Sequence, residues 1–169
     1  MKKTFRHISQ LIFILGMPLF SLSQNPEGFD KMAKKMADKS VPVIKSKQVN
    51  SLIEKNKTVV FLDARELNEF KISHIKNAKH VGYNEFSLTS VASIPKNSMI
   101  VVYCSVGYRS GKIGAQLREA GFTSVFNLYG GIFDWANNGN EVYIDNKAVR
   151  KVHPYNNKWG KWLKPELRN

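Results

Sequence analysis

Five short apolar runs, rich in β-branched residues, alternate along the chain with amphipathic stretches, and this pattern constrains the fold most. The apolar runs cover residues 41–44, 58–62, 79–81, 99–103 and 124–128. Helical periodicity is found at residues 47–55, 67–71, 85–91, 110–120 and 132–137. Because the runs lack polar alternation, each strand is expected to be buried on both faces. The sequence therefore predicts an α/β fold, a five-stranded parallel sheet with helices on both faces, in which Ser46 N-caps the first of these helices and Gly121 C-caps the fourth.

The single cysteine, Cys104, directly follows the run at 99–103 and precedes a short loop that contains Gly107 and Arg109. Sites in such folds lie at the carboxyl ends of the strands, where Asp63 is also expected. Loop N–H groups and the start of the next helix can stabilise an anion there, and Arg109 adds a cation. We therefore expect Cys104 to react as a thiolate and Gly107 to take a positive φ. The alternative is a buried core cysteine, since free cysteine packs as a small hydrophobe.

Residues 1–23 have the three-part layout of a secretory signal peptide. Basic residues at the start precede an apolar run at 11–20, and small residues follow at 21–23. The apolar run is about half the roughly 20 residues that a membrane span needs. We expect export, to the periplasm or out of the cell, with the mature chain beginning near Gln24. An uncleaved N-terminal anchor is the alternative.

The chain carries 26 basic and 13 acidic side chains, a net charge of +13. Removal of residues 1–23, which hold three basic and no acidic residues, leaves 23 basic and 13 acidic side chains, a charge of +10. The charge attracts anions, but no nucleic-acid motif accompanies it and the basic residues are scattered. We expect small anionic substrates, no nucleic acid, and at most weak contact with anionic membrane surfaces. A single cysteine also excludes a disulfide within the chain.

Two flanking segments fit the strand–helix alternation poorly. Residues 24–40 are polar and lysine-rich, and form either a short packing helix or a loose lead-in. Residues 141–169 combine basic side chains with Tyr155, Trp159 and Trp162. We favour a C-terminal extension whose aromatic residues cover exposed core, because such side chains chiefly supply buried contact area. The alternative is a patch for anions or membrane surfaces.

Two separated motifs resemble the rhodanese-like sulfurtransferases. The first, at residues 61–78, is similar to the Asp-x-Arg…Glu-Phe…Gly-His-Ile…Ala pattern of that family. The second begins at Val101, includes the loop Cys104-Ser105-Val106-Gly107-Tyr108-Arg109-Ser110, and continues to Trp135. Together they cover about residues 41–140 in the family's order. Ser73 stands where the family usually has Gly and Lys76 where Pro is common, which affects local backbone geometry rather than the chemistry.

The resemblance implies a single domain in which Cys104 carries a persulfide between a sulfur donor and an acceptor. The thiolate would attack the outer sulfur of a small anionic donor such as thiosulfate, and sulfite would leave. A thiol, or cyanide in an assay, would then take the sulfur. The N–H groups from Ser105 to Arg109 would stabilise the persulfide anion. No cofactor and no metal is implied.

Further roles are assigned to the loop. Arg109 is expected to hold sulfonate oxygens, because its planar fork of donors suits an oxyanion. The alternative for Arg109 is an ion pair that stabilises the loop. Val106 and Tyr108 are expected at the rim, where they influence which donors fit, and Ser110 is expected to support the loop.

Asp63 and Arg65 either brace the active-site loop or form buried pairs. The second role is favoured, because a carboxylate close to a thiolate raises the pKa of the thiol. It would pair Asp63 with backbone N–H groups and Arg65 with Glu66 or Glu69. His74 is expected to close a turn rather than to act as a base.

Two other functions compete with sulfur transfer. Cysteine phosphatases and arsenate reductases also combine a cysteine, loop N–H groups and an arginine, with one residue more between cysteine and arginine. Four residues, 105–108, intervene here, and this shorter loop suits a single persulfide sulfur. The second competitor is a non-catalytic rhodanese-like binding module. Such modules usually lack the cysteine, whereas this chain has Cys104 together with Arg109, and we predict an active enzyme.

Overall fold

Five parallel strands form the central sheet of the computed structural model, which describes residues 26–169. The spatial order is β1-β5-β4-β2-β3. The bounds are β1 (Val43–Ile44), β2 (Val60–Asp63), β3 (Lys79–His80), β4 (Met99–Tyr103) and β5 (Ser124–Leu128). The register places Asp63 of β2 beside Tyr103 of β4, and Val102 of β4 beside Asn127 of β5. The carboxyl ends of three adjacent strands therefore meet at the sheet edge where Cys104 lies.

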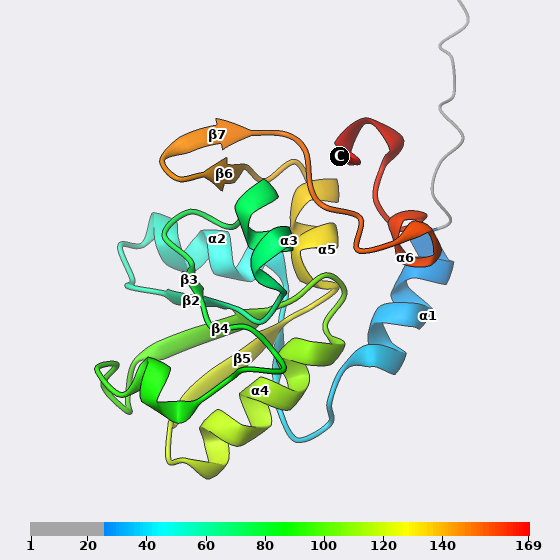
Figure 1. The fold of residues 1–169 in the computed structure, drawn as a ribbon. Coiled ribbons are helices and arrows are strands. Elements are labelled where there is room, and N and C mark those ends of the chain that lie inside the picture. Colours follow the sequence, from blue (N-terminus) through cyan, green and yellow to red (C-terminus); the bar gives the residue numbers. More distant parts are fainter. Residues whose placement is uncertain (1–25) are drawn as a thin grey trace, which may run out of the picture.

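Helices cover both faces of this sheet, which confirms the predicted fold class (Figure 1). One face carries α2 (Ser46–Glu54) and α5 (Gly131–Asn137), and the other carries α4 (Tyr108–Glu119) and the 3₁₀ helix η1 (Leu88–Val91). The short helix α3 (Leu67–Ile72) follows β2.

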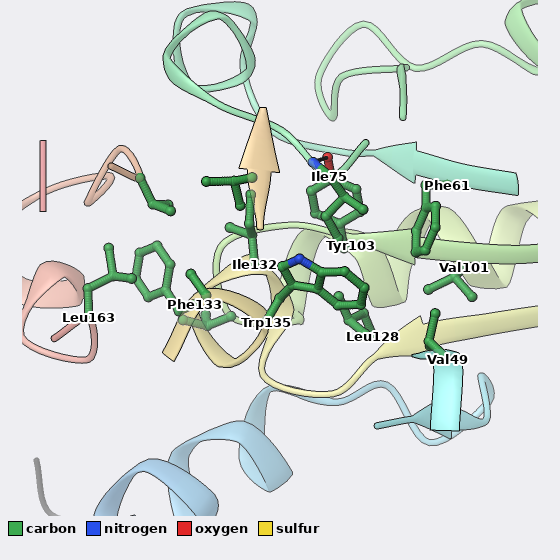
Figure 2. Packing of buried hydrophobic residues seen from close by; sticks show 14 of the residues in the cluster. Val49, Phe61, Ile75, Val101, Tyr103, Leu128, Ile132, Phe133, Trp135 and Leu163 are labelled. Atoms are coloured by element: carbon green, nitrogen blue, oxygen red, sulfur yellow. Dashed lines mark hydrogen bonds between the residues drawn. The ribbon is translucent and has the colours of Figure 1, made fainter. Parts of the chain in front are cut away.

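Successive residues of β4 point to opposite faces, as the pleat of a strand requires. Val101 and Tyr103 pack in the cluster beneath α2 and α5, where Trp135 lies among them in Figure 2. Ile100 and Val102 join the cluster beneath α4. Neither face of β4 meets solvent, so its sequence shows no polar alternation.

Two predicted helix caps are wrong by one position. Ser46 is the first residue of α2, and Lys45, with an extended backbone, is the N-cap. The Gln48 side chain accepts the Lys45 N–H at 3.0 Å, while the Ser46 hydroxyl reaches Asp134 at 3.4 Å. At the end of α4, Ala120 is the C-cap and Gly121 follows it in the left-handed region, where glycine commonly terminates helices.

The segments that flank the sheet are folded against it. The N-terminal segment forms the helix α1 (Pro26–Met36). The C-terminal segment forms the hairpin of β6 (Val142–Ile144) and β7 (Lys147–Val149), then α6 (Asn157–Gly160) and the 3₁₀ helix η2 (Pro165–Leu167). Val142, Val152 and Leu163 are buried in the core cluster, and Figure 2 shows Leu163 beside Phe133. Trp159 and Trp162 pack against the same cluster, as favoured from the composition, whereas Tyr155 is 46% exposed.

The predicted signal peptide, residues 1–23, and its cleavage near Gln24 lie outside the described residues. Across residues 26–169, no helix has the length and apolar character needed to cross a membrane.

Candidate active site

Cys104 lies immediately after β4, with 1% of its surface exposed. The Gly107 N–H donates a hydrogen bond to its sulfur, with 3.2 Å between N and Sγ. Gly107 has the predicted positive φ, +110°, and this turn brings its amide back towards the sulfur three residues earlier. The N–H groups from Ser105 to Arg109 are all expected to face the sulfur. Within residues 26–169, Gly107 is the residue whose N–H donates a hydrogen bond to it. The helix α4 begins directly after Gly107 and directs its N-terminal end at the loop.

The start of α5 fixes the backbone on which Cys104 is carried. The Ile132 N–H donates to the Cys104 carbonyl at 2.9 Å, and the Phe133 N–H donates to the Ser105 carbonyl at 3.2 Å. This contact requires a glycine at 131, because a Cβ there would lie 2.3 Å from the Cys104 carbonyl oxygen. The loop therefore has little freedom at its first two residues.

Asn127 fixes the middle of the loop from β5. Its buried side chain donates to the Gly107 carbonyl at 2.8 Å and accepts the Ser110 hydroxyl at 2.8 Å. Ser110 thus contacts the loop through Asn127. Asn127 is a site residue not expected from the sequence, although a polar residue within the apolar run 124–128 is a signal that could identify it.

Arg109 forms a two-pronged ion pair with Glu69 of α3. Its guanidinium donates to both carboxylate oxygens, at 2.7 and 2.9 Å, and the Ser105 hydroxyl donates to Glu69 at 3.0 Å. Glu69 is 1% exposed. Burial alone would raise the pKa of Glu69, but the hydrogen bonds and charge of Arg109 outweigh it and hold that pKa below its ordinary value. Of the two roles considered for Arg109, the structure shows the loop-stabilising ion pair, with a partner that sequence reasoning missed.

Asp63 and Arg65 form a second ion pair, fully buried, at the end of β2. Arg65 Nη2 lies 2.7 Å from Asp63 Oδ2 and 2.6 Å from the Ser73 carbonyl. Asp63 also accepts the Arg65 backbone N–H at 2.9 Å, in line with the expected backbone pairing. The expected pairing of Arg65 with Glu66 or Glu69 is wrong. The Arg65 guanidinium binds the Asp63 carboxylate, two residues earlier, and the Glu69 carboxylate binds Arg109 instead. The structural role of this pair is therefore the one observed.

A cavity of about 350 Å³ opens above Cys104. Its walls come from the Cys104 loop, the end of α1, the N-cap of α3, the segment after β3, and the C-terminal segment. The lining residues are Met36, Glu66, Tyr83, Asn84, Cys104, Ser105, Val106, Tyr108, Arg109, Tyr155 and Trp159. Val106 and Tyr108 thus lie where the rim was expected. A larger hollow of about 770 Å³ lies between α1 and the start of α2, but no cysteine or histidine lines it, so the smaller cavity is the candidate active site.

A family model of the rhodanese-like domain matches residues 45–138. The chain belongs to the rhodanese-like family. Among curated proteins it is similar to the tRNA uridine(34) hydroxylase of Photorhabdus laumondii subsp. laumondii, with 29% identity over 129 residues. That alignment covers 73% of this chain and 36% of the relative, so the chain spans about a third of the length of the enzymes it matches.

Solved structures show the same fold. A Bacillus halodurans protein superposes with a TM-score of 0.57 at 21% identity, over 79% of this chain and 95% of that one. The rhodanese-like domain of an Anabaena protein superposes with a TM-score of 0.56 at 24% identity, over 68% of this chain and 89% of that domain.

Three cavity residues lie outside the part of the chain that the rhodanese-like model matches. Met36 comes from the end of α1, and Tyr155 and Trp159 come from the C-terminal segment. The Tyr155 ring lies over Arg109, 4.9 Å from its Cζ to the ring centroid. Sequence reasoning placed these aromatic residues over the core and did not connect them with Cys104. The composition of the C-terminal segment contains no signal for this contact, because the segment follows the Cys104 loop by some fifty residues in the sequence.

Proposed function

We propose that this rhodanese-like protein is a sulfurtransferase in which Cys104 carries the transferred sulfur. The observation that supports this most is the position of the thiol. It lies in a cavity wall, on a loop held from three sides, with the Gly107 N–H 3.2 Å from its sulfur. Such preorganised donors stabilise negative charge without reorganisation during the reaction.

The reaction has two displacements. The Cys104 thiolate attacks the terminal sulfur of thiosulfate, the S–S bond of the donor breaks, and sulfite leaves with the bonding electrons. Cys104 then carries a persulfide anion, which the Gly107 N–H and the start of α4 stabilise. Cyanide or a thiolate acceptor attacks the terminal sulfur, and the Cys104 thiolate is restored as the leaving group. Sulfur and charge balance in each step, and no outside oxidant is needed.

Intact-mass measurement tests this proposal. The protein is incubated with thiosulfate, desalted, and compared with Cys104→Ser treated in the same way. We expect one added sulfur atom on the wild type, none on the variant, and loss of the added mass after cyanide treatment. If the wild type stays unmodified with every sulfane-sulfur donor, a binding module is the better description. Release of phosphate from an aryl phosphate would instead indicate a cysteine phosphatase.

A further inference from the structure

Besides Val106 of the Cys104 loop, five large apolar or aromatic residues line the Cys104 cavity: Met36, Tyr83, Tyr108, Tyr155 and Trp159. We call this set the aromatic collar. Figure 1 shows how it comes about, because α6 of the C-terminal segment returns to lie beside α1. The contact between Phe29 of α1 and Trp162, with centroids 5.9 Å apart, joins the two segments.

The backbone of the C-terminal segment is shaped to present two members of the collar. Tyr155 has a φ of +63°, in the left-handed region that a bulky residue rarely occupies. The Asn156 N–H donates to the Pro154 carbonyl at 2.8 Å, which closes a three-residue turn around Tyr155. The Asn156 side chain then accepts the Trp159 N–H at 3.1 Å and begins α6. Strained backbone of this kind concentrates at functional sites, and here it holds a half-exposed tyrosine over Arg109.

The charge of the cavity is balanced rather than positive. Among the described residues, Arg109 is the one basic residue in its lining, and both of its terminal guanidinium nitrogens donate to Glu69. Glu66 adds a second carboxylate 3.8 Å from the same guanidinium. A dianion such as thiosulfate therefore meets no free cation here, whereas an apolar group meets Met36 and the rings of the collar. The many lysines within residues 26–169 do not change this, because none of them lines this cavity.

We propose that the aromatic collar selects a sulfane-sulfur donor that has an aromatic or apolar organic body and at most one negative charge. This inference rests on the proposed function and names the substrate class of the same site. Organic thiosulfonates and hydropersulfides belong to this class. The cavity of about 350 Å³ has room for such a body, since a cavity of roughly 150 Å³ holds benzene.

The chemistry of the first displacement is unchanged with such a donor. For a thiosulfonate, the Cys104 thiolate attacks the terminal sulfur, the S–S bond breaks, and a sulfinate leaves with the bonding electrons. Cys104 again carries a persulfide anion, because the transferred sulfur keeps the negative charge it had in the donor, and the charge of the attacking thiolate leaves on the sulfinate. The organic body remains in the collar, away from the bond that forms.

Three donors test the proposal with cyanide as the common acceptor. Thiosulfate is a dianion without a body, methanethiosulfonate is a monoanion with a small body, and benzenethiosulfonate is a monoanion with an aromatic body. The measurement is kcat/KM for thiocyanate formation. We expect the wild type to use the benzene donor at least about tenfold better than the methane donor, as two or more ring contacts would give.

Two variants locate this preference in the collar. Tyr155→Asn tolerates the left-handed φ, and Trp159→Leu keeps an apolar side chain at the partly buried position. Each should lower the benzene-to-methane ratio by about two- to tenfold, the loss of one aromatic contact. Tyr143→Asn, in the same C-terminal segment but lining a different hollow beside Trp135, is the matched control and should leave the ratio unchanged.

The outcomes separate the two proposals. A wild-type ratio near one overturns the collar proposal whether or not the variants fold, and so does a preference that both folded variants retain. In either case, sulfur loading of Cys104 from any of the donors still supports sulfur transfer. Failure of all three donors to load Cys104 overturns the proposed function itself.

Discussion

Glu69→Gln probes the interaction that holds the active-site loop to α3. The Glu69 carboxylate accepts four hydrogen bonds: two from Arg109, one from the Ser105 hydroxyl and one from the Glu66 backbone N–H. Glutamine keeps the shape of the side chain, but its NH₂ group replaces one of the two accepting oxygens. That NH₂ group faces other donors and cannot accept their hydrogen bonds. It also leaves Arg109, whose side chain is 13% exposed, without its nearest and buried counter-charge.

The expected cost follows from this burial. Removal of one partner from a buried ion pair costs about 3–5 kcal/mol, and the partial exposure of Arg109 places this pair near 3 kcal/mol. For a chain of this size, 1 kcal/mol shifts the melting temperature by roughly 2–4 °C, so Glu69→Gln should lower it by roughly 6–12 °C. Thermal unfolding followed by circular dichroism at pH 7 measures the shift.

Glu66→Gln is the matched control. The Glu66 side chain is 43% exposed and lies 3.8 Å from Arg109, and exposed pairs of this kind contribute about 0.2–1 kcal/mol. Its melting temperature should therefore stay within a few degrees of the wild type, by roughly 4 °C at most. Equal shifts in the two variants would refute the reasoning.

The pH dependence of the Glu69→Gln effect gives a second check. Arg109 holds the pKa of Glu69 below its ordinary value of 4.5, against the effect of burial. The stabilisation is therefore fully present above pH 4.5 and is lost as the pH falls through the lower pKa of the folded state. The gap between wild type and variant should narrow in that acid range. A gap that stays constant down to full protonation would show that charge is not its cause.

Two other substitutions test packing around the site. Ser73 is fully buried and its hydroxyl has no hydrogen-bond partner within residues 26–169, so Ser73→Ala should raise the free energy of unfolding by about 1 kcal/mol in a urea titration; a decrease would contradict this. Gly131→Ala places a Cβ 2.3 Å from the Cys104 carbonyl and should lower kcat/KM for sulfur transfer by about tenfold or more, because the loop must move. Gly139 also has a positive φ, +81°, but a Cβ added there would meet no atom within 4 Å, so Gly139→Ala should retain activity. Equal activity of the two variants would refute the steric argument.

The fold could be predicted from the sequence because its decisive signal is local. The runs at 99–103 and 124–128 coincide with β4 and β5, since both strands are sealed on two faces and their apolar residues stop where the sheet stops. Cys104 and Gly107 could be placed for the same reason, because a strand end and a glycine in a short loop are local features. Residues 85–91 were harder, and only Leu88–Val91 is helical there, as a 3₁₀ helix.

The ion pairs could not be predicted, because each depends on which of several carboxylates reaches an arginine in space. Arg65 had Asp63, Glu66 and Glu69 within a few residues, and their distance along the chain does not show which of them it contacts. The register of β2 beside β4 buries Asp63 next to Arg65, while α3 turns Glu69 towards Arg109, forty residues further along the chain. Burial removes both arginines from water, so each requires a carboxylate of its own.

This division of the carboxylates determines how the site handles charge. With the Arg109 guanidinium hydrogen-bonded to Glu69, the hydrogen bond to a sulfur anion on Cys104 comes from the Gly107 N–H, the N-terminal end of α4 adds its partial charge, and Arg109 acts only through its charge. One hydrogen bond and a partial helix charge suit a single negative charge on one sulfur atom better than the two charges of an inorganic donor. A donor with two negative charges would need a second cation for tight binding. A donor that binds through its organic body depends least on such a cation. The buried ion pair and the aromatic collar therefore favour the same class of substrate, although they come from segments that meet only in the folded chain.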